Sequence, residues 1–354
     1  MKKSGKQKTT DTSAAQVVYN FLQMFHYNSM LTNADIENFK TFTQKFNSFI
    51  VIGHKEPDGD CISSSLGLAE LLRQMGKNVE VLSAGPFKRT ETKKYQEFFA
   101  NSLKPNQNYS NFGMFIVDCS DKSRIGEIDA AQLEIPVFVI DHHKTAQNTG
   151  NNCIIHPESP AAVYLIQLLF EAICGEVTEG IAPTLFFGLC TDTGFFRFLE
   201  EDSAEVFMAV SRLVAKGASP KKTYNHMTGG KAFSTRKLLG VLLNHAQSYF
   251  GGRLIITYEN QEDTAQFGEN GRDSDMLYQA LTSIEGVEAV VNIKQETETE
   301  CTAGLRSIDS VDVSKVAAVF GGGGHKNAAG LSTEIKVQEF IPKLVEEFAK
   351  IFEK

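Results

Sequence analysis

The chain has 354 residues, of which 42% are hydrophobic and 22% are charged, and its formal net charge is −8. This length favours two domains over one core, and this composition is typical of globular chains rather than disordered or fibrous ones. The acidic balance argues against a protein that holds long nucleic acid by neutralising its phosphates. An acidic chain can still act on phosphates if its carboxylates hold metal cations.

The start of the chain and its cysteines predict a cytoplasmic protein. The first 14 residues are polar, no apolar stretch of signal-peptide length follows them, and no run of eighteen apolar residues occurs. The six cysteines form no Cys-x-x-Cys pair, which is typical of free thiols in a reducing compartment. Residues 1–44 form a predicted N-terminal extension, polar at first and then helical, with apolar residues at Val17, Phe21, Leu22 and Phe25.

Residues 45–216 alternate between short apolar runs and helical periodicity, which predicts an α/β domain with a parallel sheet. We expect Gly76 to end the first helix and Ser159 to cap the second. Asp202 and Glu205 predict a capping box at the third helix. The predicted helices cover residues 60–74, 160–174 and 202–217, and the predicted strands are FIVIG, NVEVLSA, GMFIVD and IPVFVID.

The last third of the chain predicts a second, smaller domain. Residues 217–235, which begin with the sequence GASPKKTYNHMTGGKA, show little apolar periodicity and are interpreted as a linker. Residues 236–354 then predict a smaller α/β domain with a mixed sheet and a helix before Gly321. Its predicted strands are RLIITYE, VEAVVNIK, CTAGLRS and AAGLST.

Acidic residues and histidines follow several of the predicted apolar runs of the first domain. Each one alone is typical of a turn or helix cap, but strand ends of an open α/β sheet meet at one rim. Five carboxylates and three histidines at one rim would repel one another unless cations were bound. The residues are His54, Asp58 and Asp60 in HKEPDGD, Asp118 in GMFIVD, Asp141, His142 and His143 in IDHHKT, and Asp192 in CTDTG.

Oxygen and imidazole ligands without thiolate favour Mn²⁺, with Mg²⁺ or Co²⁺ as substitutes, over a structural zinc ion. The ligands suffice for two ions that share one bridging carboxylate. Two such ions can activate a water molecule and stabilise an in-line attack on phosphorus.

The second domain contains residues that could bind an anion. Backbone N–H groups of a glycine run can form a concave anion site, although such a run is more often a flexible turn. An arginine at a strand end offers a planar fork for phosphate, and its alternative is a surface ion pair. The candidates are Arg306 in GLRS, and Gly322, Gly323, Gly324, His325 and Asn327 in GGGGHKNAAG.

The motifs HKEPDGD, VDCSD, IDHHKT and CTDTG, in this order and followed by GGGGH, closely resemble the DHH phosphoesterase family with its DHH-associated C-terminal domain. The resemblance runs from about residue 45 to the C-terminus, and it is greatest to the bacterial nanoRNases that also dephosphorylate adenosine 3′,5′-bisphosphate (pAp). It implies an active site in the cleft between two domains, and short RNA or small nucleotides as partners. It also implies a homodimer as a family-level expectation, and neither long duplex nucleic acid nor a membrane as partner.

The resemblance also implies a role for each candidate residue. His143 would be a donor or general acid beside the scissile phosphate, and Asp141 would orient the histidines. Asp118 would bridge two Mn²⁺ ions. One ion would be held by His54, Asp58 and Asp118, the other by Asp60, Asp118, His142 and Asp192, while Arg306, His325, Asn327 and the glycines 322–324 would hold the substrate phosphate or ribose.

Two residues depart from the family pattern without removing a ligand. Ser63 stands where many relatives have glycine, and Gly304 stands where a serine is frequent before the arginine. These departures concern only local substrate contacts.

The leading hypothesis is a two-metal phosphodiesterase and 3′-phosphatase. It would release nucleoside 5′-monophosphates from short oligoribonucleotides such as pApA or pGpG and convert pAp to AMP. A cyclic di-AMP phosphodiesterase would need the same metals and the same phosphate contacts, so this alternative stays open. The alternative outside the enzymes is a nucleotide-binding regulator.

Overall fold

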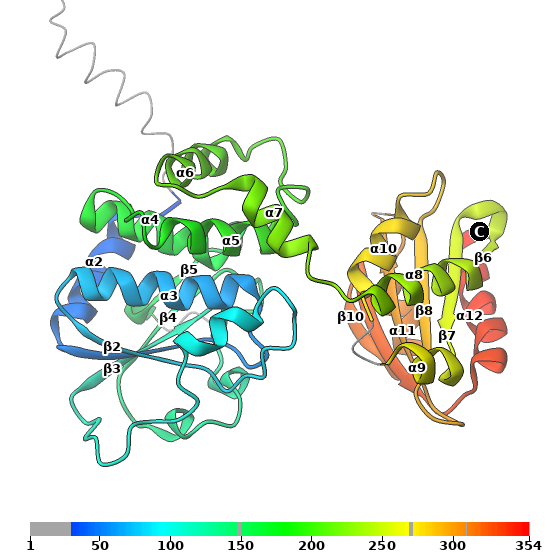
Figure 1. Ribbon diagram of the computed structural model, residues 1–354, viewed down its shortest axis with the longest axis horizontal. Helices are drawn as coiled ribbons and strands as arrows, with labels where there is room; N and C mark the ends of the chain where they lie inside the picture. Colours follow the sequence, from blue (N-terminus) through cyan, green and yellow to red (C-terminus); the bar gives the residue numbers. More distant parts are fainter. Residues whose placement is uncertain (1–29, 147–149, 269–271, 309, 354) are drawn as a thin grey trace, which may run out of the picture. The chain divides into compact units, whose positions relative to one another are not determined.

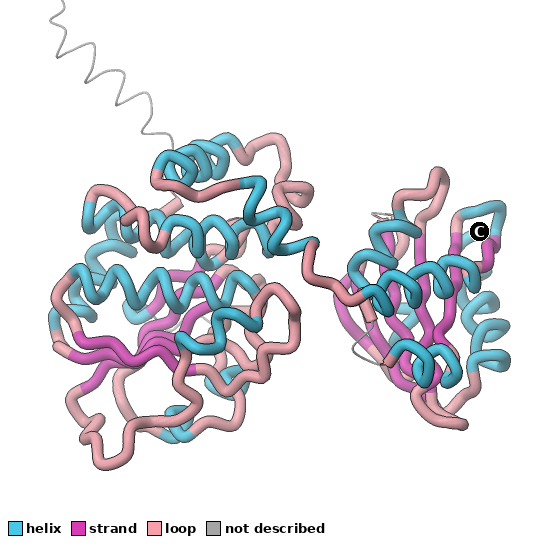
Figure 2. The backbone as a smooth tube through the Cα atoms, viewed as in Figure 1, coloured by secondary structure: helices cyan, strands magenta, loops and turns pink. Residues whose placement is uncertain are grey.

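The computed structural model describes residues 30–146, 150–268, 272–308 and 310–353. The chain divides into two compact units, Met1–Gly230 and Lys231–Lys354, and each is described by itself (Figures 1 and 2). The predicted helical positions Val17 to Phe25 lie outside the described residues. Among the helices that are described, none has both the length and the apolar character needed to span a membrane. The predicted cleft between the domains stays a prediction.

The first unit contains a five-stranded parallel sheet, which confirms the predicted fold class. The strand order is β2-β1-β3-β4-β5. The chain runs from β1 outward to β2 and then returns to β3 on the other side of β1. The carboxyl ends of β1 and β3 therefore border the switch point where open α/β sheets bind ligands. The strands are β1 (Ser48–Ile52), β2 (Asn78–Leu82), β3 (Phe112–Val117), β4 (Val137–Asp141) and β5 (Cys153–Ile155).

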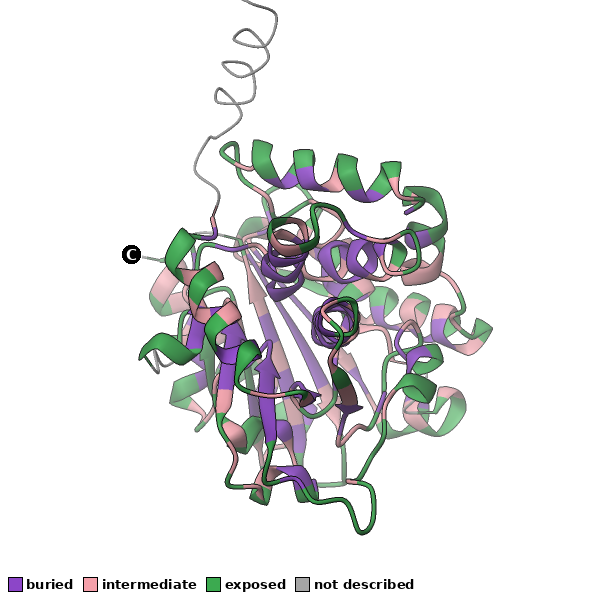
Figure 3. Cartoon of the chain, turned by 90° about the vertical axis from the view of Figure 1, so that its left-hand side faces the viewer, coloured by how far each residue is buried: buried purple, intermediate pink, exposed green. Residues whose placement is uncertain are grey.

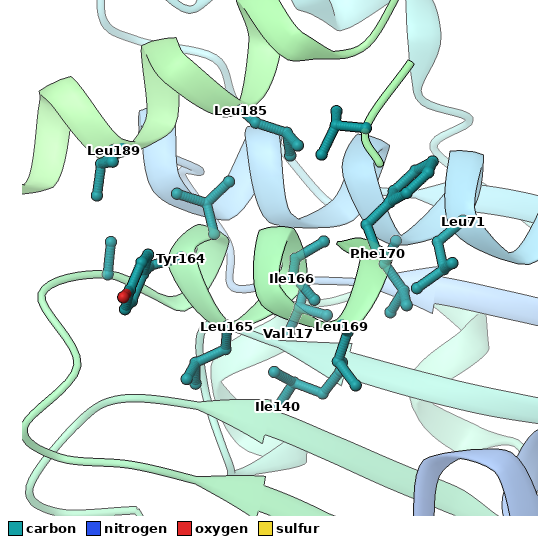
Figure 4. Close-up of a cluster of buried hydrophobic side chains, with 14 of the residues drawn as sticks. Leu71, Val117, Ile140, Tyr164, Leu165, Ile166, Leu169, Phe170, Leu185 and Leu189 are labelled. Atoms are coloured by element: carbon teal, nitrogen blue, oxygen red, sulfur yellow. The ribbon is translucent and has the colours of Figure 1, made fainter. Parts of the chain in front are cut away.

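Both faces of this sheet are covered, so its strands are apolar on both sides. On one face, Val117 and Ile140 pack against Leu165 and Leu169 of the central helix α4 (Figure 4). The burial colouring in Figure 3 shows the buried residues gathered along the strands and the inner helices. The helices are α2 (Asn33–Gln44), α3 (Gly59–Gln74), α4 (Ala162–Cys174), α5 (Ala182–Asp192), α6 (Ala204–Ala215) and α7 (Pro220–Thr228), with 3-10 turns η1 (Lys93–Phe98), η2 (Lys122–Ile125), η3 (Asp129–Gln132) and η4 (Gly150–Asn152).

The cap predicted for α4 is wrong. The helix begins at Ala162, and the Ser159 hydroxyl donates to the Ala161 carbonyl at 2.9 Å instead of capping the helix. The first free N–H groups, those of Ala162 and Val163, donate to the carboxylate of Asp60 at 2.7 and 2.8 Å. The cap therefore comes from a residue about a hundred positions earlier in the chain, which local sequence rules cannot find.

Two further boundaries test local rules. Gly76 follows α3 with a φ of 77°, so its predicted role in ending that helix is confirmed. The prediction of a capping box formed by Asp202 and Glu205 is wrong. Helix α6 starts after Ser203, and the Ser203 side chain makes no capping hydrogen bond. Within the segment predicted as a linker, 217–235, residues 220–228 form helix α7.

The second unit has a mixed sheet, as predicted, and its six strands lie in the order β10-β11-β9-β8-β7-β6. Only β7 and β8 pair in parallel. Helices α11 and α12 cover one face, whereas α8 and α10 cover the other face over β7 and β8. The strands are β6 (Gln247–Tyr249), β7 (Leu254–Glu259), β8 (Ala289–Gln295), β9 (Cys301–Ser307), β10 (Gly323–His325) and β11 (Ala328–Thr333); the helices are α8 (Phe233–His245), α9 (Gln261–Phe267), α10 (Ser274–Thr282), α11 (Val313–Val319) and α12 (Val337–Phe352), with the turn η5 (Phe250–Gly252).

Candidate metal centre

His54 lies two residues beyond the end of β1, and its ring is oriented by the backbone. Its Nδ1 lies 2.8 Å from the carbonyl of Lys55, so Nδ1–H donates there and Nε2 keeps a lone pair. That Nε2 is 3.4 Å from Oδ2 of Asp118 and 3.8 Å from Oδ1 of Asp58. Asp58 also caps α3 by accepting from the N–H of Cys61 at 3.1 Å. These contacts assemble the first group of predicted ligands.

His142 follows β4 and is held in the same manner. Its Nδ1 lies 3.1 Å from the carbonyl of Ser159, which again leaves Nε2 as the ligand atom. Nε2 faces three carboxylates: Oδ1 of Asp118 at 3.5 Å, Oδ2 of Asp60 at 3.7 Å and Oδ2 of Asp192 at 3.4 Å. The second group of predicted ligands is therefore also together. Asp192 reaches it from the last residue of helix α5 rather than from a strand end.

Asp118 lies between the two groups and divides its oxygens between them. Oδ2 faces His54, whereas Oδ1 faces His142. The residue is 2% exposed, has a φ of 57°, and its Oδ1 has no hydrogen-bond partner among the described residues. Left-handed backbone at a residue other than glycine, and an unsatisfied buried oxygen, both cost stability and mark functional positions. A carboxylate shared by two cations fits both observations.

Asp60 is both a predicted ligand and a structural residue. It is 1% exposed and accepts hydrogen bonds from Ser64 Oγ at 3.2 Å and from two backbone N–H groups of α4. Burial, with the nearby carboxylates of Asp118 and Asp192, nevertheless raises the pKa of Asp60 well above its ordinary value. The helix N-terminus alone does not compensate the buried negative charge, and a cation would.

The other pKa shifts show the same need for positive charge. Burial, with Asp118 and Asp58 nearby, raises the pKa of Asp192 to about 6 although His142 opposes the shift. Burial works against protonated histidine, but Asp118 and Asp60 outweigh it and raise the pKa of His142 to about 10. For His54 burial is likewise outweighed, by Asp118 and Asp58, and its pKa is raised. Divalent cations would take the place of these protons.

His143 and Asp141 form a unit beside the ligands. Oδ1 of Asp141 accepts from Nδ1 of His143 at 2.7 Å, and also from the backbone N–H groups of His142 at 2.8 Å and His143 at 3.2 Å. Asp141 is 1% exposed and the His143 side chain is 35% exposed. Since Nδ1 is committed to the carboxylate, Nε2 is the atom that His143 can offer to a substrate.

Sequence reasoning missed Cys61, which lies with His54 and Asp118 in a group whose possible ligand atoms are all within 4.8 Å of one another. Burial raises the pKa of the Cys61 thiol to about 12, so the thiol stays protonated and is a poor ligand. A Cβ at Gly53 would lie 2.2 Å from its sulfur, so the thiol fills space behind the site. In the sequence, the one indication that Cys61 lies near the site is its position next to Asp60 in the first turn of α3.

Arg306 and His325 lie on one face of the second unit's sheet. Arg306 pairs with Ala328, and Ala328 pairs with His325, across antiparallel strands. Paired residues point to the same side. The Arg306 guanidinium lies 4.7 Å from the ring centre of Tyr278. It makes no ion pair within the described residues, so the surface ion pair considered for it is not observed.

The glycines of GGGGHKNAAG do not form a simple loop. Gly323 and Gly324 lie in β10, where Gly324 has a φ of 146° and a Cβ would lie 2.5 Å from the Ala328 carbonyl. A Cβ at Gly322 would lie 2.4 Å from the Gly330 carbonyl. The backbone carbonyl of Asn327 accepts from the N–H of Ser307 at 3.1 Å. The absence of side chains at Gly322 and Gly324 therefore allows this segment and β11 to approach closely.

A doubly wound parallel sheet with carboxylates and imidazoles at its switch point defines a candidate metal-dependent hydrolase. Residues 48–193 match the model of the DHH family, N-terminal domain, and residues 249–354 match the DHHA1 domain. The chain belongs to the DHH phosphoesterases, which are hydrolases of phosphate esters, and the resemblance stated from its motifs is confirmed.

Several relatives share this organisation. The chain is 28% identical over 279 residues to the bifunctional oligoribonuclease and PAP phosphatase NrnA of Thermus thermophilus, covering 78% of this chain and 81% of that protein. It is 24% identical over 313 residues to the cyclic-di-AMP phosphodiesterase PdeA of Listeria monocytogenes, covering 83% of this chain but only 46% of the longer PdeA. A probable manganese-dependent inorganic pyrophosphatase of Streptococcus thermophilus is 27% identical over 151 residues, 42% of this chain and 48% of that protein.

One solved structure supports the fold over nearly the whole chain. It is an exopolyphosphatase-related protein of Bacteroides fragilis, with a TM-score of 0.77 and 22% sequence identity. The similarity covers 93% of this chain and 100% of that one.

Proposed function

We propose that the protein is a manganese-dependent phosphoesterase that hydrolyses short oligoribonucleotides to nucleoside 5′-monophosphates and dephosphorylates pAp to AMP. The observation that carries the proposal is the division of the Asp118 oxygens between His54 and His142. NrnA of Thermus thermophilus, whose printed name gives both activities, supports the choice of substrates.

The residues present fit two divalent cations. His54, Asp58 and Asp118 would hold one, and Asp60, Asp118, His142 and Asp192 the other. When bound, the cations supply positive charge to the phosphoryl oxygens and lower the pKa of a water molecule. Oxygen and imidazole ligands, with the Cys61 thiol protonated, favour Mn²⁺. The relationship to a manganese-dependent pyrophosphatase supports the same choice.

His143 is the residue proposed to move a proton. Its Nδ1–H donates to Asp141, and its protonated ring would present Nε2–H to an oxygen of the scissile phosphate or to the leaving group. Asp141 would keep the ring in this orientation and stabilise its positive charge. Asp141 is thus a positioning residue.

The second unit is proposed to bind the rest of the nucleotide. Arg306 and His325 share a face and offer a guanidinium and an imidazole to a phosphate. Because the glycines of β10 allow close strand pairing, their contribution to phosphate binding would come from backbone N–H groups at the strand's exposed edge.

The test is the initial rate of the Mn²⁺-loaded protein on four substrates at equal concentration: pAp, pApA, a 24-nucleotide RNA and cyclic di-AMP. Fast release of AMP from pApA and of phosphate from pAp, with slow turnover of the other two, is the expected result. Slow turnover of both small substrates would contradict the proposal.

The relationship to PdeA favours a second candidate, a cyclic di-AMP phosphodiesterase. In the same assay this candidate predicts the highest rate on the cyclic substrate. Tight binding of AMP without turnover of any of the four would instead indicate a nucleotide-binding regulator.

A further inference from the structure

The loop between β2 and η1 is fastened to the loop that carries two of the predicted metal ligands, His54 and Asp58. The carbonyl of Gly85 accepts from the N–H of Glu56 at 2.8 Å, and the ammonium of Lys88 pairs with the Glu56 carboxylate at 2.7 Å. Glu56 lies between the two ligands in the chain and has a φ of 54°, which is rare for a residue other than glycine. The two loops are therefore joined at Glu56.

Buried groups fix the loop after β2 more firmly than the exposed ion pair does, since ion pairs in water contribute little. Phe87 is 7% exposed and packs in one cluster with Ile62 of the first turn of α3. The Arg89 carbonyl accepts two hydrogen bonds from the buried Thr92, from its N–H at 3.0 Å and from its hydroxyl at 2.9 Å. The backbone of Arg89 is therefore held in place relative to the start of α3.

The side chain of Arg89 is exposed, and within the described residues its guanidinium has no hydrogen-bond or ion-pair partner. Its charge nevertheless acts on the candidate metal centre. Burial works to raise the pKa of the Asp58 carboxyl, but His54, the N–H of Cys61 and the charge of Arg89 lower it to about 2. The guanidinium therefore belongs to the flank of the site that His54 and Asp58 form.

A substrate phosphate at this site has oxygens on more than one side. His143 is placed to serve one flank, since its Nδ1 lies 3.8 Å from Oδ1 of Asp118, the oxygen that faces His142. The proposed function assigns no donor to the other flank, that of His54 and Asp58. A guanidinium is planar and stays protonated, and two of its N–H groups can donate to two oxygens of one phosphate.

We propose that Arg89 is a further catalytic residue, whose guanidinium donates to two oxygens of the scissile phosphate from the flank of His54 and Asp58. The proposal rests on the proposed function and adds a residue to the same site. In the reaction a water oxygen bonds to phosphorus and loses a proton, the bond from phosphorus to the leaving oxygen breaks, and the leaving oxygen takes up the proton that His143 supplies. Arg89 stabilises the negative charge on the phosphoryl oxygens and transfers no proton.

The test compares Arg89→Ala with the wild-type full chain on pAp with Mn²⁺. We expect kcat to fall by about a hundredfold, the loss typical of one donor to a developing negative charge, with a smaller change in KM. Arg89→Lys, which keeps the charge but not the planar fork, should lie between the two. Arg73→Ala removes an exposed arginine in the last turn of α3, at the opposite end from the site, and is the matched control with the wild-type rate.

Two further measurements separate a direct contact from a structural role. Added guanidinium ions should raise the rate of Arg89→Ala severalfold and should not raise the rate of the wild type. Calorimetric titration with orthovanadate, which mimics five-coordinate phosphorus, requires no turnover. Its affinity should fall in Arg89→Ala by about the same factor as kcat, because a transition-state mimic reports contacts made in the transition state.

The outcomes distinguish this proposal from the proposed function. An active wild-type enzyme whose rate and vanadate affinity survive Arg89→Ala would overturn the role of Arg89 and leave the proposed function standing. A wild-type protein that turns over none of the substrates but binds vanadate through Arg89 would contradict the proposed function and keep the contact of Arg89 with the phosphoryl group. Should Arg89→Ala fail to fold, Arg89→Gln, which keeps the stem of the side chain, decides by the same two measurements.

Discussion

The two units solve different recognition problems with different means. In the first, eight charged or imidazole side chains converge at a sheet's switch point, and Asp60, Asp141, His54 and His142 are held by hydrogen bonds to the backbone. In the second, the candidate surface is a glycine-rich sheet face with one stacked arginine. A site that binds cations can recognise any phosphate ester. Under the proposed function, the choice among phosphate esters would therefore belong to the second unit.

The variant Asp118→Asn tests most directly whether the side chains of the first unit hold the proposed cations. We expect kcat to fall by about a thousandfold or more, because one carboxylate serves both proposed ions. The check is the initial rate on pAp with Mn²⁺. Glu127→Gln removes an exposed carboxylate of the same unit and should leave the rate unchanged. Retention of more than a tenth of the activity by Asp118→Asn would show that the ligand assignment is wrong.

Asp60→Asn should damage both activity and stability, which distinguishes it from Asp118→Asn. The amide of the variant can accept a hydrogen bond from only one of the two N–H groups at the start of α4. The lost hydrogen bond should lower the free energy of unfolding by about 1 kcal/mol, which is typical of a lost helix cap. Asp118 Oδ1 has no hydrogen bond among the described residues, so its replacement carries no such cost. Thermal unfolding with EDTA measures the difference, and equal melting temperatures for the two variants would contradict the dual role of Asp60.

The convergence of the first unit's candidate ligands could be expected from the sequence for a physical reason. His54, Asp118 and His142 follow apolar strands, and the ends of parallel strands converge without further information. What it could not predict are the long-range contacts, such as the capping of α4 by Asp60 or the packing of the Cys61 thiol against Gly53. Both depend on distances between helices that no local pattern encodes.

In the second unit four of the six strands were predicted, whereas the short strands β6 and β10 were not. The row of Gly304, Gly330 and Gly323 exists only because β9, β11 and β10 pair in one register, and a glycine in a strand gives no sign of its partners. The buried Asn292 lies in an apolar run, VEAVVNIK, where it reads as an ordinary strand residue.

The sequence also gave no indication of backbone strain in the first unit. There Phe195 and Phe196 have φ values of 58° and 72°, which aromatic residues rarely adopt.

Arg306→Gln tests the second unit's half of the comparison. We expect KM for pAp to rise about tenfold to a hundredfold, the loss typical of a charged hydrogen bond to phosphate, while kcat changes little. Lys315→Gln removes an exposed positive charge from the same unit and is the control. A fall in kcat without a rise in KM would place Arg306 in the chemistry rather than in substrate binding.

The smallest expected effect is a pH dependence of metal stabilisation, confined to the first unit's site. The pKa of Asp192 is raised from 3.8 to about 6, so between these pH values the folded protein holds a proton that the unfolded chain has released. Stability from this group is therefore lost as pH rises toward 6. His142, raised from 6.5 to about 10, contributes stability below pH 6.5 that is lost as pH rises toward 10.

Mn²⁺ must displace these protons, so the rise in melting temperature between EDTA and Mn²⁺ should grow by a few degrees from pH 5.5 to pH 8. Differential scanning fluorimetry across that range measures it. Asp192→Asn should flatten the dependence below pH 6, whereas Asp202→Asn, an exposed carboxylate before α6, should not. An equal rise in melting temperature at both pH values would mean that Mn²⁺ does not displace the protons of Asp192 and His142. The charged cluster of the first unit would then not be the metal site that the proposed chemistry requires.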